Sequence, residues 1–503
     1  MLEFWRNPEF VRHLRAELRP PRAITAAFLA VVVCALAGLA CWASEHENLR
    51  VFFRTFHGWL VGIQFVGLAF WCASGCGQAI TRERELKTYD FLKTTRLTAG
   101  EIVLGKILGA PIMGYFVVGC TLPISLAVGA LGGYGLGTLV GVYVLLLAFA
   151  LFVSLMGLWL SMLLEKSSSA AVAILTLLPI GWTFSLGYSP FSGLGSLSAV
   201  PTIFSLYGLK DEPTLLRPTL FGMATPSLVV SLLLYAAFGA WLALMLVRNL
   251  KKDREQIVLL SRWQAVGFGA FLNVLLYAFL NPQALTSTAA YHTIRPEEVA
   301  TLAMAMNGLF IFVVGLATLT PHERLKVWWR RRAAGEEKYF SESGLAWPWL
   351  IAVALVAYVL LIAEAAGLRS AVGFERWHLG QAAIQLLVLL VFAGRDVMFL
   401  QWCNLTRMKR PLVKGVLYLM LYYFAVSIVG IVVAATTGSE SNMVFDALTP
   451  YGPFMAEGAG IARLSPAIYI GLGVQMAFIL LILKAIAMRL SRPAISGATA
   501  AAA

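Results

Sequence analysis

The stretch Gly100–Lys106 holds the residue types of a phosphate-binding loop. Its sequence, GEIVLGK, matches the first seven positions of G-x-x-x-x-G-K-[ST], in which backbone amides and the lysine bind phosphate groups. The eighth position is Ile107, so the hydroxyl that would bind Mg²⁺ is missing. An apolar segment follows, where a nucleotide-binding fold would be needed. We therefore expect no nucleotide hydrolysis, no catalytic residue and no bound cofactor on this chain.

Other residues that could do chemistry are isolated. His322 and Glu323 begin an H-E pair, but no second histidine completes H-E-x-x-H. Cys72 and Cys76 lie one helical turn apart within an apolar stretch, where packing is the usual role of cysteine. We therefore expect no metal site, and we expect the chain not to be an enzyme.

The composition is that of a membrane protein. Of 503 residues, 59% are hydrophobic and 13% are charged, and the mean hydropathy is +0.78. Soluble domains carry roughly 25% charged residues. The apolar residues also come in blocks of about 20, the length of a helix that crosses a bilayer. We predict an all-α, polytopic transmembrane helical bundle of about 12 spans. They are Ile24–Ala43, Trp59–Ile80, Gly105–Leu131, Leu136–Leu164, Ser169–Tyr188, Pro226–Val247, Gln264–Leu280, Glu298–Leu319, Trp347–Ala366, Gly380–Phe399, Leu412–Ala435 and Pro466–Met488.

The basic residues orient these spans. With the N-terminus inside, most of the 39 Lys and Arg residues fall in cytosolic segments, which agrees with the positive-inside rule. Both termini are then cytosolic. This placement of basic residues explains the net charge of +13. The residues lie at the membrane ends, where anionic lipids are found, so we expect lipid contacts and no nucleic-acid partner.

The chain is predicted to have two six-span halves, residues 1–250 and 251–503. The sixth span follows Thr225-Pro226 and the twelfth follows Ser465-Pro466, each after the longest predicted outer loop of its half. Ser or Thr before Pro is a typical helix start. The second half is therefore interpreted as a divergent repeat of the first, an arrangement common in transporters.

An amphipathic helix is predicted before the first span. Asn7, Pro8 and Glu9 have the types of an N-cap, a first helical position and an acidic first turn. Apolar and arginine side chains then alternate at helical spacing until Pro20-Pro21. This helix either lies in the membrane interface or supplies positive charge that anchors the topology.

The polar segment Glu83–Lys106, between the second and third spans, is predicted to be structured. Thr88 can cap a short helix, and Thr98 with Glu101 forms a capping-box pattern at the start of the third span. A solvated linker would not need two sets of capping residues, so this segment is the best candidate for contact with another molecule.

This segment resembles the first cytosolic loop of type-2 ABC exporter permeases, the membrane subunits of ATP-binding-cassette transporters. Arg96 stands where that family has proline, and the second half of the chain lacks the motif. With the six-span topology the likeness extends over Met1–Leu250. The residues that carry it are Glu83, Arg84, Glu85, Thr88, Asp90, Leu92, Thr95, Thr98, Glu101, Ile102, Gly105 and Lys106.

The resemblance implies a permease subunit in a bacterial inner membrane. Its loop would be a coupling helix that docks on a separate cytosolic ATPase dimer, which would hold ATP and Mg²⁺. The pathway would lie within one chain, as an intrachain pseudo-dimer, or between two copies in a homodimer. The residues implied in coupling are Glu83, Glu85, Thr88, Asp90, Leu92, Thr95, Thr98, Glu101 and Lys106.

Uncharged polar residues inside the predicted spans are candidates for lining a transport path. Hydrogen bonds between helices are the alternative role for such residues. No chain of buried acidic residues points to proton coupling. The candidates are Gln64, Asn273, Asn307, Gln385 and Gln475.

Two other functions stay open at this stage. A membrane-embedded enzyme, such as a lipid-modifying transferase, would need clustered His, Asp or Glu at one membrane face. An ABC subunit could also transmit force to a partner without moving a substrate. The sequence does not identify the substrate, although apolar spans favour lipids, drugs or other amphiphiles over ions.

Overall fold

The computed structural model forms two compact units, and each is described by itself. Unit 1 is Met1–Arg254 with Ala278–Tyr291, and unit 2 is Glu255–Tyr277 with His292–Ala503. The structure describes residues 7–45, 47–164, 169–183, 192–208, 218–221, 223–252, 257–279, 296–338, 341–372, 379–406, 411–437, 448–450 and 466–491. The predicted outer loop before the twelfth span lies largely outside these residues, whereas the one before the sixth span is described in part. The repeat of the two halves stays a prediction.

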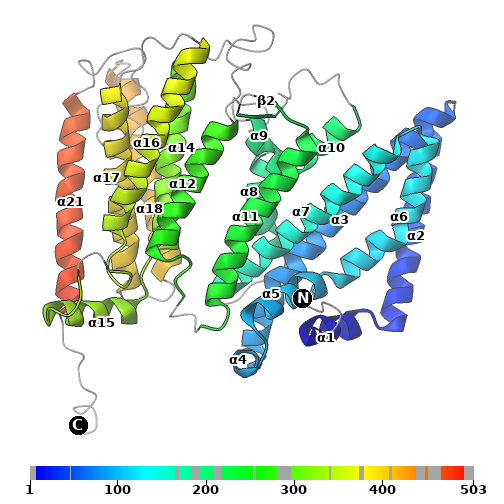
Figure 1. Cartoon of the computed structure of the whole chain (residues 1–503), viewed down its shortest axis with the longest axis horizontal. Helices are drawn as coiled ribbons and strands as arrows, with labels where there is room; N and C mark the ends of the chain where they lie inside the picture. The colour runs from blue at the N-terminus through cyan, green and yellow to red at the C-terminus, as the bar shows by residue number, and fades with distance from the viewer. Residues whose placement is uncertain are drawn as a thin grey trace. The chain divides into compact units, whose positions relative to one another are not determined.

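Unit 1 is built from long helices (Figure 1), with a two-stranded antiparallel pair in which Thr219 lies opposite Ala224. Its elements are α1 (Pro8–Glu17), α2 (Pro20–Glu45), α3 (Leu49–Glu85), α4 (Tyr89–Thr94), α5 (Ala99–Gly109), α6 (Ile112–Leu131), α7 (Leu136–Leu163), α8 (Ser169–Trp182), α9 (Ser192–Gly195), η3 (Ser196–Ser198), α10 (Val200–Leu206), β1 (Thr219–Leu220), β2 (Met223–Ala224) and α11 (Ser227–Asn249).

Unit 2 is also helical. Leu325 and Trp328 of the short helix α15 are buried against Ile486 and Leu490 near the end of α21. The described elements are α12 (Arg262–Phe279), α14 (Pro296–Ala317), α15 (His322–Ala333), α16 (Trp347–Val372), α17 (Leu379–Asn404), α18 (Pro411–Thr437) and α21 (Pro466–Leu490).

The predicted helical membrane class is confirmed. Among the described residues, eight helices are long and apolar enough to cross a membrane: α2, α3, α6, α7, α11, α17, α18 and α21. Shorter apolar helical stretches are described at Val172–Gly181, Met306–Ala317 and Pro348–Leu360. The chain is a multi-pass membrane protein by the length and composition of these helices.

The third predicted span, Gly105–Leu131, is wrong as a single helix. The structure breaks it into α5 and α6 at Ala110 and Pro111. Proline has no backbone N–H, and its ring clashes with the carbonyl one turn earlier, so a continuous helix is disfavoured there. Lys106 therefore belongs to a separate short helix that precedes the span.

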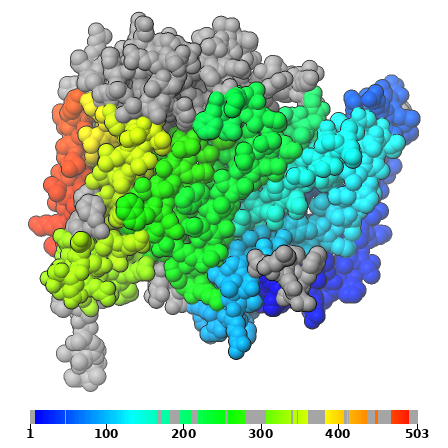
Figure 2. All heavy atoms as spheres, in the orientation of Figure 1, coloured from blue at the N-terminus to red at the C-terminus, as the bar shows by residue number. Residues whose placement is uncertain are grey.

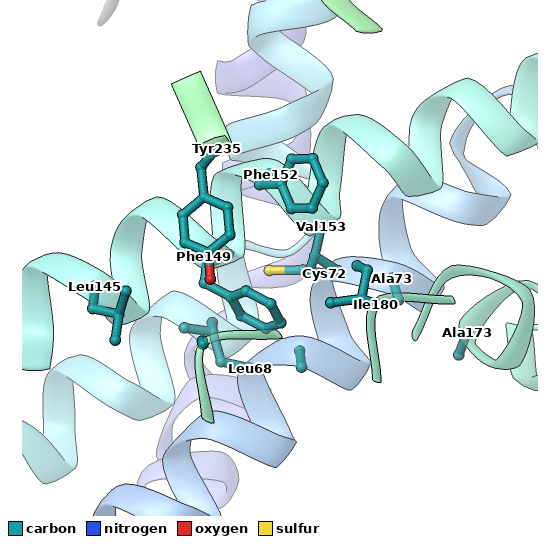
Figure 3. Close-up of a cluster of buried hydrophobic side chains, with 13 residues drawn as sticks. Leu68, Cys72, Ala73, Leu145, Phe149, Phe152, Val153, Ala173, Ile180 and Tyr235 are labelled. Carbon is teal, nitrogen blue, oxygen red and sulfur yellow. The ribbon is translucent and has the colours of Figure 1, made fainter. Parts of the chain in front are cut away.

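The core of unit 1 lies where α3, α7, α8 and α11 meet (Figure 3). Tyr235 of α11 stacks on Phe152 of α7 with ring centroids 5.3 Å apart, and Phe149 stacks on Phe65 of α3 at 5.0 Å. Cys72 is fully buried in this cluster and acts as a packing residue, as expected from its apolar surroundings. Interlocked aromatic side chains hold α3 and α7 as the central pair.

Glycines let the core helices approach closely. A Cβ atom at Gly157 of α7 would lie 3.0 Å from the backbone oxygen of Ala73 in α3. A Cβ at Gly77 of α3 would lie 2.2 Å from Val172 of α8. Small residues at such crossings are typical of membrane helices, which associate mainly through close packing.

Replacing Gly157 with valine is expected to destabilise unit 1 by about 1–3 kcal/mol, because the added atoms meet backbone that cannot move aside easily. Gly58 in α3 offers a matched control, since its Cβ would have no neighbour within 4 Å. Thermal unfolding of the purified protein measures both variants. Equal melting temperatures for Gly157→Val and Gly58→Val would contradict this packing.

Candidate partner-docking site

The helix α4 is set off from α3 by a defined turn. The amide of Lys87 donates to the Arg84 carbonyl at 3.1 Å, and the amide of Thr88 donates to the Glu83 carbonyl at 2.9 Å. Lys87 has φ 57°, the left-handed conformation at the C′ position of a Schellman motif. The chain therefore reverses sharply after α3, although the left-handed residue is not a glycine.

One side of α4 and its preceding turn is open to solvent. Phe91 is 75% exposed and Leu86 is 64% exposed, while the Asp90 side chain is 86% exposed. The light-blue α4 protrudes at the lower edge of unit 1 (Figure 2). An exposed phenylalanine beside charged residues is a candidate anchor for another protein, because aromatic side chains are enriched among the residues that contribute most to binding at protein interfaces.

The opposite side of α4 is fixed to the rest of unit 1. Tyr89 and Leu92 are buried, and the Tyr89 hydroxyl donates to the Leu250 carbonyl after α11. The Arg84 guanidinium lies 4.9 Å from the Tyr89 ring centroid. The Lys251 ammonium donates to the Thr95 carbonyl at 3.3 Å. A push on α4 would therefore act on α3 and α11 together.

The predicted capping box is confirmed, and the predicted cap of α4 is wrong. The Glu101 amide donates to Thr98 Oγ1 at 3.2 Å, and the Thr98 amide donates to Glu101 Oε2 at 2.7 Å. The hydrogen bond from the Thr98 amide lowers the pKa of Glu101. Thr88 makes no side-chain cap, since its hydroxyl donates back to the Glu83 carbonyl at 3.3 Å.

The turn between α4 and α5 has a proline-like geometry without proline. Thr95, which precedes Arg96, has φ −64° and ψ 154°. This is the extended conformation that a residue before proline adopts. The Thr95 hydroxyl donates to the Leu92 carbonyl at 2.7 Å, which supports the same turn.

The N-terminal helix α1 packs against α5. Asn7 caps α1 as predicted, with its Oδ1 accepting from the Glu9 amide at 3.0 Å, and its Nδ2 donates to the Glu101 carbonyl at 2.7 Å. A Cβ at Gly105 would lie 2.8 Å from the Glu9 Cβ, and one at Gly109 would lie 2.8 Å from the His13 Cβ. The two glycines of α5 thus leave room for the Glu9 and His13 side chains of α1.

A buried charge network joins α1, α3 and α5. Lys106, which is fully buried, donates to Glu9 Oε1 at 2.9 Å and to Glu83 Oε1 at 2.6 Å. Arg12 donates to the same two oxygens, at 2.8 Å and 2.7 Å. Two carboxylates and two cations balance, so the network can be buried without net charge. It is named the α1–α3–α5 charge network below.

The network lowers the pKa of Glu9 to about 2, although burial acts in the opposite direction. The lowering comes from His13, whose Nε2 lies 3.4 Å from Glu9 Oε1, and from the nearby charges of Lys106 and Arg12. Glu9 is therefore ionised at every physiological pH. The network is therefore assigned a structural role, as a clamp between α1, α3 and α5.

The predicted coupling residues fall into three groups by burial. Glu83, Leu92 and Lys106 are buried, so they cannot contact a docked partner directly. The half-buried residues are Thr95 and Glu101. Those that are exposed and able to contact a partner are Glu85, Thr88, Asp90 and Thr98. Sequence reasoning missed Leu86 and Phe91; apolar residues next to charges in a polar segment are the signal that could have identified them.

The five candidate path residues are all buried and lie on several helices. Gln64 of α3 donates to Thr121 of α6 at 2.8 Å and accepts from Tyr143 of α7 at 3.0 Å. Asn273 donates to the Gly269 carbonyl of its own helix at 2.9 Å. Asn307 and Gln385 are 1% and 5% exposed. Gln64 therefore makes hydrogen bonds between helices, and Asn273 makes one within its own helix.

Gln475 belongs to a polar cluster of unit 2 that is built around Arg395 and Asp396. Arg395 donates to Asp396 at 2.5 Å, to Gln475 at 2.6 Å and to Tyr423 at 3.0 Å. Tyr423 in turn donates to Asp396 Oδ2 at 2.6 Å. The cluster crosslinks α17, α18 and α21. The consecutive tyrosines at 422 and 423, within an apolar span, are the sequence feature that could have indicated this polar cluster.

No family model, curated protein or solved structure matches this chain.

Replacing Lys106 with methionine is expected to destabilise unit 1 by about 3–5 kcal/mol, because two buried carboxylates lose a cation that bridges them. Arg96→Met is a matched control, since Arg96 is exposed and the structure gives its side chain no partner among the described residues. Thermal unfolding measures both. A melting temperature for Lys106→Met equal to that of the control would show that the network does not stabilise the fold.

The charge network also predicts a pH dependence. The folded-state pKa of Glu9 lies below its ordinary value of 4.5, so its stabilisation is complete above pH 4.5 and is lost as the pH falls towards 2. The melting temperature of the wild type should fall over this window. Glu9→Gln should have a lower melting temperature than the wild type at pH 7. Its melting temperature should also fall less than that of the wild type over the same acid window. Parallel curves for the two proteins would refute the assignment.

Proposed function

We propose that this chain is the permease subunit of an ATP-driven ABC exporter, and that α4 is the helix on which a separate cytosolic ATPase dimer docks. The proposal rests first on the likeness of Glu83–Lys106 to the coupling loop of type-2 ABC exporter permeases. The finer architecture belongs to the same proposal: about twelve spans in two six-span halves, with both termini in the cytosol of a bacterial inner membrane.

The observation that carries the proposal is the two-sided character of α4. Its outer side exposes Asp90 and Phe91, while its inner side holds the buried Tyr89 and Leu92. A docking helix that only binds a partner needs an exposed side. A helix that also transmits movement needs a rigid base, and α4 has one in the bond from Tyr89 to Leu250.

The α1–α3–α5 charge network extends this base. Glu83 lies in the last turn of α3 and Lys106 in α5, on either side of α4 in the chain, and the two are bonded directly. The two ends of the loop are therefore tied together beneath the exposed helix. A rigid-body movement imposed on α4 would be passed to α3, and through α5 to α6, without being absorbed by bending of the loop.

Nucleotide chemistry is assigned to the partner. The segment Gly100–Lys106 lies within the helix α5, and its lysine is bonded to Glu9 and Glu83 in the charge network. ATP and Mg²⁺ would bind the ATPase subunit, and this chain would convert the movement of that subunit into movement of its spans. The pathway would form either within one chain or between two copies. The two cases differ in how many copies of this chain the complex contains.

The proposal predicts that an ATPase co-purifies with the chain and that α4 supports the complex. Phe91→Ala should weaken the association about thirty-fold, the effect of losing an interface side chain worth ~2 kcal/mol. Asp90→Arg should weaken it by reversing a charge. Leu136→Ala is a matched control, because Leu136 is 76% exposed at the start of α7.

Absence of any ATPase from the purified complex, or association unchanged in both α4 variants, would contradict the proposal. ATP hydrolysis by the complex without movement of any cargo across vesicles would favour the alternative of a force-transmitting subunit.

A further inference from the structure

A cavity of about 300 Å³ lies between α2, α3 and α6 of unit 1, the dark-blue to cyan helices of Figure 1. Its lining is almost entirely aliphatic or aromatic, with Leu29 and Val33 from α2, Leu60 and Trp71 from α3, and Val117 from α6. The volume is about twice that of the ~150 Å³ apolar cavity that holds a benzene molecule. It can take a stretch of hydrocarbon chain but not a whole lipid.

The polar side chains in the cavity wall bond to the protein. Gln64 donates to Thr121 at 2.8 Å and accepts from Tyr143 at 3.0 Å. The Thr121 hydroxyl donates to the carbonyls of Val117 and Val118, both at 3.1 Å. The wall therefore presents mainly hydrocarbon to an occupant, which disfavours a polar ligand.

The cavity is open to the surroundings of α2. Leu29 and Val33 line it but are 55% and 42% exposed. The helix α2 is one of the candidate membrane spans and is mostly unburied. Because bilayer hydrocarbon surrounds such a helix, an acyl chain can enter the cavity from the side.

A cation lies at the end of α2 nearest α1, on the same face as the cavity. Arg22, Ala26, Leu29 and Val33 follow at spacings of four, three and four residues, which places them on one helical face. Arg22 is about 6 Å along the axis from Ala26, a lining residue. Its side chain leans towards the helix N-terminus, and it is 63% exposed with a loose 3.7 Å contact to Glu17.

We infer that this cavity binds an acyl chain of an anionic phospholipid from the leaflet at the α1 end, with the lipid phosphate on Arg22. The chain fills the apolar space between α2, α3 and α6. The phosphate pairs with an arginine held at the depth where head groups lie. The inference does not depend on the proposed function, because it concerns only unit 1 and the bilayer.

Native mass spectrometry of the delipidated full chain tests the site, with phosphatidylglycerol and phosphatidylcholine of equal chain length as probes. Gly67→Leu should fill the cavity, since Gly67 lines it and its Cβ would have no neighbour within 4 Å. Gly62→Leu is the matched control on the same helix, with equal space around its Cβ and no place in the lining. We expect phosphatidylglycerol binding to fall at least ten-fold in Gly67→Leu and to be unchanged in Gly62→Leu.

Arg22→Gln should weaken phosphatidylglycerol binding about five-fold, which corresponds to the ~1 kcal/mol of one basic residue near an anionic surface. Arg82→Gln, at the exposed end of α3, is the control for loss of one charge. Equal binding of the two lipids, binding unchanged in Gly67→Leu, or equal losses in Arg22→Gln and Arg82→Gln would each overturn the inference. A matching melting temperature for Gly67→Leu and Gly62→Leu shows that any loss of lipid is not a loss of fold.

Discussion

The α1–α3–α5 charge network is the constraint on which the polar end of unit 1 depends. Lys106 is fully buried between the carboxylates of Glu9 and Glu83, and Arg12 closes the network from its exposed side. A charge buried this deeply is tolerated only when its partners are held at bonding distance. The network therefore fixes where α1 lies, how α3 ends and where α5 begins.

Other features of this end follow from that constraint. The glycines at 105 and 109 let α1 come close enough for Glu9 to reach Lys106. The Schellman turn at Lys87 reverses the chain, so that Glu83 and Lys106 can meet although α4 lies between them in sequence. The exposed side of α4 is then presented on a rigid support, which is the property that a force-transmitting contact requires.

The structure separates polar residues that share a membrane setting but differ in role. Gln64 bonds across three helices and closes the wall of an apolar cavity. Arg395 and Asp396 form a crosslink among α17, α18 and α21 through two tyrosines and Gln475. In both places the polar groups bond to one another, because an unpaired polar group in hydrocarbon costs several kcal/mol.

The sequence by itself determined the membrane class, most helix positions, the Asn7 cap and the Thr98–Glu101 capping box, since these depend on residues close together in the chain. It also located the polar segment around α4. It did not show the break at Pro111, the missing side-chain cap at Thr88 or the burial of Glu83 and Lys106. Only the tertiary structure decided which motif residues face solvent and which clamp the helices together. Glu9 and Lys106 are far apart in sequence, and no local pattern encodes the folding that brings their charges within 2.9 Å.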